Sequence, residues 1–253
     1  MRFTGRRAIV TGSAGAIGGS IARALAAEGA TLGLVDRRPA QKKPDMGPDA
    51  RCVECLADFA DLAQLRAAMD EAIEQMGGVD ILVNAAGVTS FGSAAELAEA
   101  EWDRVVSINL KAVFFSCQSV LDPMRSQARG GRIVNIGSLL GKNGGNARPW
   151  LDASEQKGSG NVAYGVSKAG VHALTVYLAK ELASASITVN AVAPGPIVSG
   201  MTSKFPDKLR ASIPLGRMGQ PEEVAAATLF LASPDAGFIT GEILDLNGGA
   251  WCD

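Results

Sequence analysis

A glycine-rich segment near the start of the chain constrains the possible folds most. Residues 6–18 read RRAIVTGSAGAIG, in which the apolar run 8–10 precedes glycines at positions 12, 15 and 18. Apolar residues then recur with helical spacing at Ile17, Ile21 and Leu25. A strand, a glycine turn and a helix in this order form the first unit of a dinucleotide-binding fold. The glycines let a phosphate approach the backbone, and the start of the helix supplies free N–H groups. A tight turn without a ligand would look the same.

A second strand strengthens the cofactor interpretation. The run Thr31–Val35 is apolar and ends at Asp36. An acidic residue about 20 positions beyond the glycines is where such folds bind the adenosine ribose hydroxyls. The glycine turn and the acid together predict a dinucleotide site.

Composition sets the class of protein. The chain has 253 residues, of which 47% are hydrophobic, enough for a buried core in one large α/β domain or two small ones. The net charge of −2 argues against a nucleic-acid partner or an anionic membrane surface. We see no apolar run of transmembrane length and no signal-peptide pattern, so we expect a cytoplasmic protein.

The cysteines do not indicate a metal site. Cys52 and Cys55 form a CxxC pair, but they lie in a predicted strand, where residues three apart point to opposite faces. His172 is the only histidine, and there is no second cysteine pair. We therefore expect no bound metal.

Strand and helix patterns alternate along the whole chain. Near-continuous apolar strands separated by helices indicate one Rossmann-like, doubly wound parallel sheet with helices on both faces and right-handed crossovers. The predicted strands are residues 8–10, 31–35, 51–56, 79–83, 132–136, 187–192 and 243–246, and the main predicted helices are 17–28, 61–76, 101–126, 161–183 and 221–231.

Several motifs in this order resemble the short-chain dehydrogenase/reductase family along the whole chain. They are Thr11–Gly12 with Gly18, Asp58, Asn84–Gly87, Asn109, Ser138, Tyr164–Lys168 and Pro194–Gly195. The segments ITVNAVAPG, PLGRMGQPEEVA and ITGEILDLNGG are most similar to 3-oxoacyl-(acyl-carrier-protein) reductases, but they recur in sugar, steroid and small-alcohol dehydrogenases of the family. One departure is Ala16, which replaces the middle glycine of the TGxxxGxG motif.

The resemblance implies an NAD(P)-dependent oxidoreductase that moves hydride between a nicotinamide and a carbonyl or secondary alcohol. Tyr164 and Lys168 lie four residues apart on one helix face, where an ammonium group would lower the pKa of the phenol. Alone, such a pair would more often be an exposed helix pair, and Ser138 changes this balance. Ser138 follows a strand at the ligand-binding edge and could hold the substrate oxygen. By resemblance, Tyr164 transfers the proton, Lys168 also binds the nicotinamide ribose, and Asn109 completes a water relay.

The resemblance also implies the cofactor contacts. They are Gly12, Ser13, Ala16, Ile17, Gly18, Asp36, Arg37, Asp58, Phe59, Asn84, Ala85, Gly87, Tyr164, Lys168, Pro194, Gly195, Ile197 and Ser199. Asp36 favours NAD because it would repel a 2′-phosphate, and the glycine turn has no basic residue. Arg37 and Arg38 keep NADP possible, since an arginine after this strand can pair with that phosphate.

Further expectations concern assembly, His172 and a rival function. Apolar helices around 105–115 and 171–182 predict a homo-oligomer, by resemblance a homotetramer. His172 falls on the stripe of Tyr164 and Lys168, and we expect a packing or subunit-contact residue rather than a catalytic one. A protein that kept the fold to sense nucleotides and lost catalysis is the rival in another class; it would not need Ser138, Tyr164 and Lys168.

The connection between Ser138 and Tyr164 is longer than family members usually have. The surplus, about 142–160, reads as a loop whose two ends adjoin catalytic residues. We expect Trp150 and Leu151 to add apolar wall to the substrate cleft, with Arg148 or Asp152 for polar selectivity. A surface insertion without a role is the alternative, because a longer loop costs little entropy.

Overall fold

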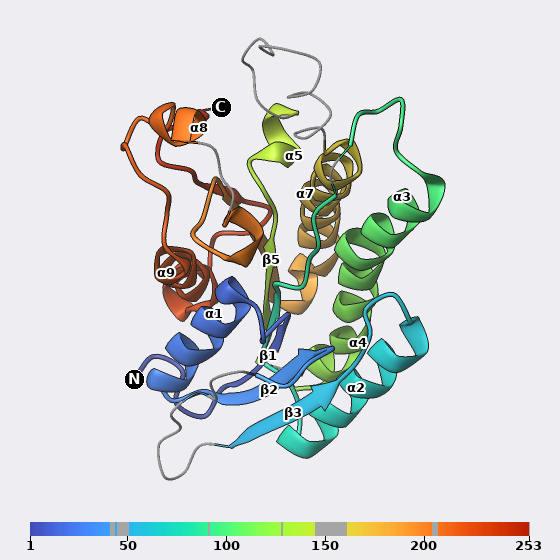
Figure 1. Ribbon diagram of the computed structural model, residues 1–253. Coiled ribbons are helices and arrows are strands. Elements are labelled where there is room, and N and C mark those ends of the chain that lie inside the picture. The colour runs from blue at the N-terminus through green and yellow to red at the C-terminus, as the bar shows by residue number, and fades with distance from the viewer. Residues whose placement is uncertain are drawn as a thin grey trace.

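The computed structural model describes residues 1–40, 44, 51–90, 92–127, 129–144, 161–203 and 207–252. These residues form one seven-stranded sheet in the order β3-β2-β1-β4-β5-β6-β7 (Figure 1). Every neighbouring pair is parallel, which confirms the predicted doubly wound fold. The strands are β1 Arg7–Thr11, β2 Thr31–Asp36, β3 Cys52–Leu56, β4 Ile81–Asn84, β5 Gly131–Ile136, β6 Ile187–Pro194 and β7 Ile243–Leu246.

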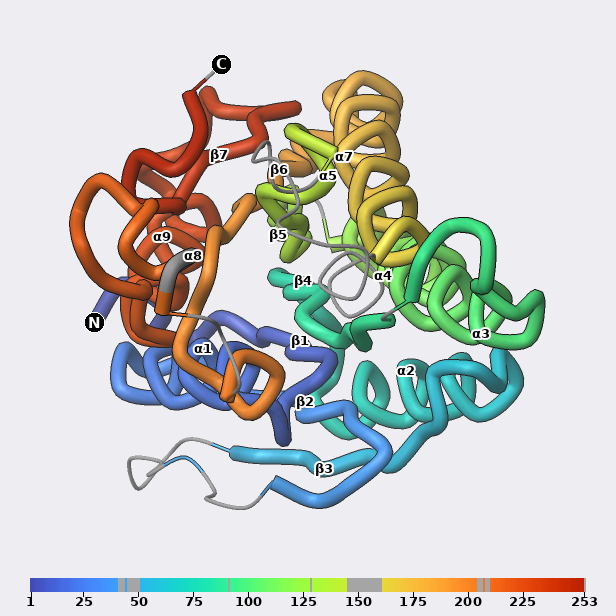
Figure 2. The backbone as a smooth tube through the Cα atoms, turned by 45° about the horizontal axis from the view of Figure 1, so that its top comes forward, coloured from blue at the N-terminus to red at the C-terminus, as the bar shows by residue number. Residues whose placement is uncertain are grey.

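Helices cover both faces of the sheet, as Figure 2 shows from a second direction. On one face lie α1 (Ala16–Ala27) and α9 (Pro221–Ala232), and on the other α2 (Leu62–Met76), α4 (Ala112–Ser126) and α7 (Val162–Leu182). In β1, Ile9 belongs to the core on the α2 side, whereas Ala8 and Val10 belong to the core on the α1 side. The strands read as nearly continuous apolar runs because both of their faces are buried.

The long helix predicted at 101–126 contains a change of helical type. Helix α3 (Glu99–Val106) continues through the π-helical segment η1 (Ser107–Lys111) into α4. The chain after β5, predicted as a loop, begins with the short helix α5 (Leu140–Asn143). The remaining short elements are η2 Ala183–Ala185, η3 Gly200–Thr202, α8 Asp207–Ala211 and η4 Pro234–Ala236.

The helical run Glu99–Ser126 is, among the described residues, the one long and apolar enough to cross a membrane by length and composition. Core helices of large domains pass the same test, and α4 in this run packs against α2, β4 and β5. The run is therefore weak evidence for a membrane span.

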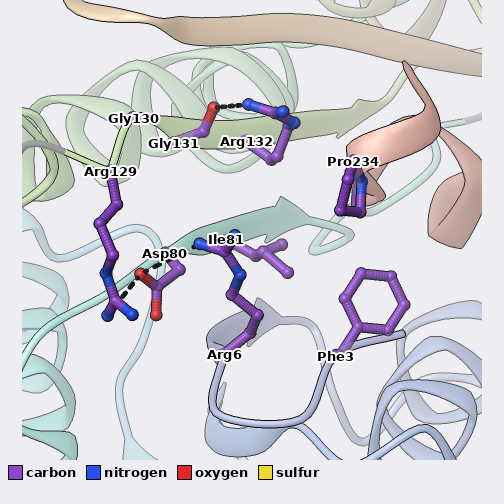
Figure 3. A pocket seen from close by; sticks show the side chains of 10 residues that line it. Phe3, Arg6, Asp80, Ile81, Arg129, Gly130, Gly131, Arg132 and Pro234 are labelled. Carbon is purple, nitrogen blue, oxygen red and sulfur yellow. Dashed lines mark hydrogen bonds and ion pairs between the residues drawn. The ribbon is translucent and has the colours of Figure 1, made fainter. Parts of the chain in front are cut away.

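The amino edge of the sheet is closed by an ionic cluster. Asp80, which precedes β4, is buried and accepts hydrogen bonds from the backbone N–H and the Nε of Arg7, both at 2.9 Å. Arg129 approaches it at 3.2 Å and Arg6 at 3.8 Å (Figure 3). The hollow beside this cluster has a volume of about 30 Å³. A water needs ~10–15 Å³, so the hollow takes water and no larger ligand.

Candidate active site

The glycine turn joins β1 to α1 with almost no spare space. Gly12 has φ +69°, and a Cβ there would lie 2.6 Å from the Ala86 backbone. A Cβ on Gly18 would collide with the Gly12 carbonyl oxygen. Both positions need glycine, because only then can the start of α1 lie directly on the turn.

The substitution at Ala16 leaves this turn intact. Helix α1 begins at Ala16, and the residue before it, Gly15, has extended backbone with φ −80° and ψ 167°. Alanine has the best helix propensity, so the first helical position suits it. Among the described residues no side chain caps this helix end. The first-turn N–H groups are thus available to a phosphate, and the segment fits a dinucleotide.

Asp36 connects the end of β2 to the same turn. Its two carboxylate oxygens accept hydrogen bonds from the backbone N–H of Ala14 at 3.0 Å and of Arg38 at 3.1 Å. A carboxylate has about four acceptor sites, so this one can still accept ribose hydroxyls. Arg37 and Arg38 are exposed beside it.

Three side chains predicted to contact the cofactor point elsewhere. Asn84 is 2% exposed, and its amide donates to Asn135 Oδ1 at 2.9 Å and Cys117 Sγ at 3.3 Å. Phe59 and Ile197 are buried in the two hydrophobic cores, one on each face of the sheet. These residues can meet a cofactor only through their backbone, because their side chains are buried in the interior.

The other predicted contacts lie near the carboxyl edge of the sheet. Asp58 is exposed, and its Oδ1 accepts from Ala60 N–H at 2.9 Å. The Ser199 hydroxyl pairs with Thr202 Oγ1 at 3.3 Å, so it caps η3. The Pro194 carbonyl accepts from Leu139 N–H at 2.9 Å, which joins β6 to the segment after Ser138. Ser13 and Ile17 belong to the glycine turn and α1, Ala85 and Gly87 follow β4, and Gly195 follows β6.

Ser138, Tyr164 and Lys168 come together as predicted. Ser138 lies two residues beyond β5, and its side chain is hydrogen-bonded to the Tyr164 phenol. Lys168 Nζ is 5.9 Å from the centre of the Tyr164 ring and donates to the Ile136 carbonyl at 2.7 Å. The side chain of Ser138, from the segment after β5, therefore lies beside those of Tyr164 and Lys168 from α7.

The electrostatics of Tyr164 differ from the expectation. Burial raises the pKa of the phenol, and the hydrogen bond to Ser138 opposes this rise. Burial also lowers the pKa of Lys168 to about 8. The phenol is therefore protonated at neutral pH, and Lys168 carries its charge below about pH 8.

Asn109 joins the loop after β4 to helix α7. It lies in η1 with 0% exposure, and its Oδ1 accepts from Val88 N–H at 2.8 Å. Its Nδ2 donates to the Val88 carbonyl at 2.9 Å and to Ser167 Oγ at 3.1 Å. A Cβ on Gly87 would lie 3.5 Å from both Asn109 Oδ1 and Lys168 Nζ, so the two groups are neighbours. π-helical turns occur frequently at functional sites.

Sequence reasoning missed the role of Thr11. Its hydroxyl accepts from Ala85 N–H at 3.2 Å and Ala86 N–H at 3.4 Å, which fixes the chain after β4 to the end of β1. The position next to Gly12 was the available signal, since a hydroxyl at a strand end can satisfy the neighbouring backbone.

Comparison with known proteins agrees with this geometry. Residues 12–250 match the family model described as enoyl-(acyl carrier protein) reductase. A solved short-chain dehydrogenase/reductase variant from Serratia marcescens superposes with a TM-score of 0.85 at 33% identity, over 99% of both chains. A short-chain type dehydrogenase/reductase from Mycobacterium marinum gives 0.87 at 30% identity, over 99% of this chain and 97% of that one. The chain belongs to the short-chain dehydrogenase/reductase family, and it is an oxidoreductase of carbonyl and alcohol groups that uses a nicotinamide cofactor.

Two curated proteins of known name are similar to this chain along nearly its whole length. Nodulation protein G of Rhizobium sp. (strain N33) is 39% identical over 254 residues, covering 98% of this chain and 97% of that protein. The 3-oxoacyl-(acyl-carrier-protein) reductase FabG of Thermotoga maritima is 37% identical over 257 residues, covering 98% and 99%.

Proposed function

We propose that this protein reduces the 3-oxo group of an acyl thioester to a hydroxyl with NADH. One observation carries the proposal: the Tyr164 phenol is hydrogen-bonded to Ser138, and Lys168 Nζ lies 5.9 Å from the centre of its ring. A protonated phenol is a proton donor, which is what a carbonyl oxygen needs as it becomes an alcohol. The similarity to 3-oxoacyl-(acyl-carrier-protein) reductases supports the thioester.

The proposed roles follow from the positions of the groups. The nicotinamide, when bound, supplies the hydride. Ser138 Oγ holds the substrate oxygen, and Tyr164 gives it a proton. Lys168 keeps positive charge near the phenol and binds the nicotinamide ribose. Asn109 holds the Val88 backbone against α7 and stands at the start of the proton relay to Lys168.

The cofactor site is proposed to prefer NAD(H). The glycine turn and the start of α1 would hold the diphosphate, and Asp36 would accept from both ribose hydroxyls. A 2′-phosphate would place its charge against the Asp36 carboxylate, which is 9% exposed and therefore poorly screened. We further propose a cytoplasmic homotetramer.

A substrate panel tests the proposal. Purified protein is mixed with NADH or NADPH and with 3-oxoacyl thioesters, ketoses, steroid ketones and small ketones, and nicotinamide absorbance is followed. We expect the highest kcat/KM for a 3-oxoacyl thioester with NADH. A higher kcat/KM for a sugar, steroid or small ketone would make that compound class, rather than a 3-oxoacyl thioester, the substrate. Tight NADH binding without turnover of any substrate would favour the nucleotide-sensing rival.

A further inference from the structure

His172 has no part in the proposed chemistry or cofactor site, although it is the only histidine of the chain. It lies on α7, one turn beyond Lys168 and two turns beyond Tyr164, so the three side chains share one side of the helix. It is 9% exposed in the single subunit. This burial agrees with the expectation of a packing or subunit-contact residue, in its packing form, and the ring makes a polar contact as well.

The ring of His172 is hydrogen-bonded to the residue that carries the catalytic hydroxyl. The backbone N–H of Ser138 donates to His172 Nε2 at 3.3 Å. Since Nε2 accepts this bond, the ring is neutral and its proton is on Nδ1. Burial lowers the pKa of His172 to about 4, and the charges of Lys168 and Lys142 act in the same direction.

Two glycines allow the chain around Ser138 to rest on this ring. A Cβ on Gly137 would collide with His172 Nε2, and a Cβ on Gly141 would lie 2.9 Å from Cε1. The segment 137–141 therefore contacts the imidazole on both sides of Ser138. Helix α5, which includes Gly141, packs against α7 (Figure 1).

We propose that His172 is a positioning residue for Ser138, which it holds at a fixed place relative to Tyr164. Ser138 stands on a connection between elements, whereas Tyr164 and Lys168 stand on α7. The His172 ring links the two directly, because it belongs to α7 and accepts the Ser138 N–H, in addition to the bonds of Ser138 to Tyr164 and of Lys168 to the Ile136 carbonyl. A misplacement of ~1 Å at a reacting group costs about 10²-fold in rate, so such a link matters for catalysis. The inference rests on the proposed function of Ser138.

Because the chain has one histidine, ¹⁵N-histidine labelling gives a single set of ring signals. The charged and titratable groups around the ring are Lys168 and Tyr164 on α7, and Lys142 on α5, which pairs with Asp245 of β7 at 2.8 Å. We expect the neutral Nδ1–H tautomer at about pH 8, and we expect it to persist as the pH is lowered to about 5. An ordinary histidine would already be mostly protonated there, because its titration midpoint is ~6.5. The Nε2–H tautomer, or titration near the ordinary midpoint, would overturn the proposal. This readout requires no substrate and no variant.

Kinetics test the link to Ser138. His172→Leu introduces an apolar side chain of similar size and removes the Nε2 acceptor of the Ser138 N–H. We expect kcat to fall about tenfold or more. The KM for NADH should change less than about twofold, and His172→Gln should restore most of kcat because its side-chain oxygen can accept. In a Ser138→Ala background, His172→Leu should cost nothing further, since residues that act as one unit are not additive.

Thr175→Val is the matched control. Thr175 is a buried polar residue one turn further along α7, and its hydroxyl accepts from Asn135 at 2.9 Å without touching Ser138. We expect this variant to lose thermal stability and keep kcat. An unchanged kcat in His172→Leu, or an equal loss in Thr175→Val, would contradict a positioning role. If the native enzyme turned over none of the panel while the ring showed the Nδ1–H tautomer, the proposed function would fail and the contact with Ser138 would stand.

Discussion

The hydroxyl of Tyr164 is the single group on which the proposed proton transfer depends. Tyr164→Phe keeps the ring and removes that hydroxyl, so we expect kcat to fall about 10²-fold or more. The Kd for NADH, from fluorescence titration, should stay within about twofold, because the proposed contacts with the diphosphate and adenosine lie on the glycine turn and Asp36. Tyr177→Phe is the control, since Tyr177 lies on the same helix and is 77% exposed. A Tyr164→Phe enzyme with more than about a tenth of the native rate would refute the assignment.

Asp36 governs the proposed choice of cofactor. Asp36→Ser removes the charge that would face a 2′-phosphate while leaving a small polar side chain. We expect the native protein to favour NADH over NADPH by about tenfold or more in kcat/KM, and the variant to approach parity. Arg37→Ala in the native background should then reduce the remaining activity with NADPH. Equal kcat/KM for both cofactors in the native protein would mean that Arg37 outweighs Asp36.

His172 also predicts a pH dependence of stability. Its pKa is about 4 in the folded protein and 6.5 as the ordinary value, so between these the unfolded chain binds a proton that the folded chain does not. The free energy of unfolding therefore decreases as the pH falls from about 6.5 to about 4, by up to ~1.4 kcal/mol per unit from this group. Urea unfolding of the native protein and His172→Gln should show the extra acid sensitivity in the native protein alone. Parallel curves would contradict the buried neutral ring.

At the residue scale, the sequence predicts which residues gather at the site better than it predicts where their side chains point. Ser138, Tyr164 and Lys168 meet as expected because strand ends and helix spacing determine their positions. Asn84, Phe59 and Ile197 have buried side chains, and a single sequence does not reveal which side chains at and beyond the strand ends turn inward. The pKa of Tyr164 depends on burial, which the spacing of Tyr164 and Lys168 does not contain.

At the scale of elements, the five inner strands were predictable because they are buried on both faces and largely apolar. The edge strands β3 and β7 are only partly buried, and their short apolar runs still identified them. The π-helical turn at Asn109 was not, since within one apolar helix a short change of helical type leaves no clear pattern. Helix α5 was missed because it has four residues, two of them polar, between glycines at 137 and 144. Ala16 now has an explanation, since it occupies the first helical position of α1.

The insertion between α5 and α7 carries an element-scale prediction. Residues 145–160, with Arg148, Trp150, Leu151 and Asp152, lie outside the described residues, so their role in the substrate cleft stays a prediction. Its base is held where Lys142 Nζ pairs with Asp245 at 2.8 Å and donates to the Ile243 carbonyl at 3.1 Å. Trp150→Ala should change KM or the ranking of substrates and leave NADH affinity and Tm unchanged. Trp251→Ala, near the end of the chain, is the control, and identical kinetics in both would mean that the insertion does not touch substrate.

At the scale of the whole molecule, exposed apolar side chains on α4 and α7 support the proposed tetramer. Phe114 is 39% exposed, Val166 46% and Tyr177 77%. Large apolar groups on neighbouring helices of one sheet face are typical of a surface that meets another subunit. Light scattering should give the mass of a tetramer, and Tyr177→Asp should shift the mass toward smaller species. A monomeric mass for the native protein at working concentration would refute the assembly.

The ionic cluster at Asp80 has a consequence for how the sequence of this protein can evolve. Arg6 and Arg7 at the start of β1, and Arg129 before β5, form ion pairs with Asp80 at the amino edge of the sheet. The proposed chemistry lies at the opposite edge, and no side chain proposed for it belongs to the ionic cluster at Asp80. Loops at the carboxyl edge can therefore accumulate substitutions that alter substrate choice, while the ionic cluster at Asp80 is unchanged. Substitutions that change substrate choice in such a fold therefore need not lower its stability, because different residues determine the two properties.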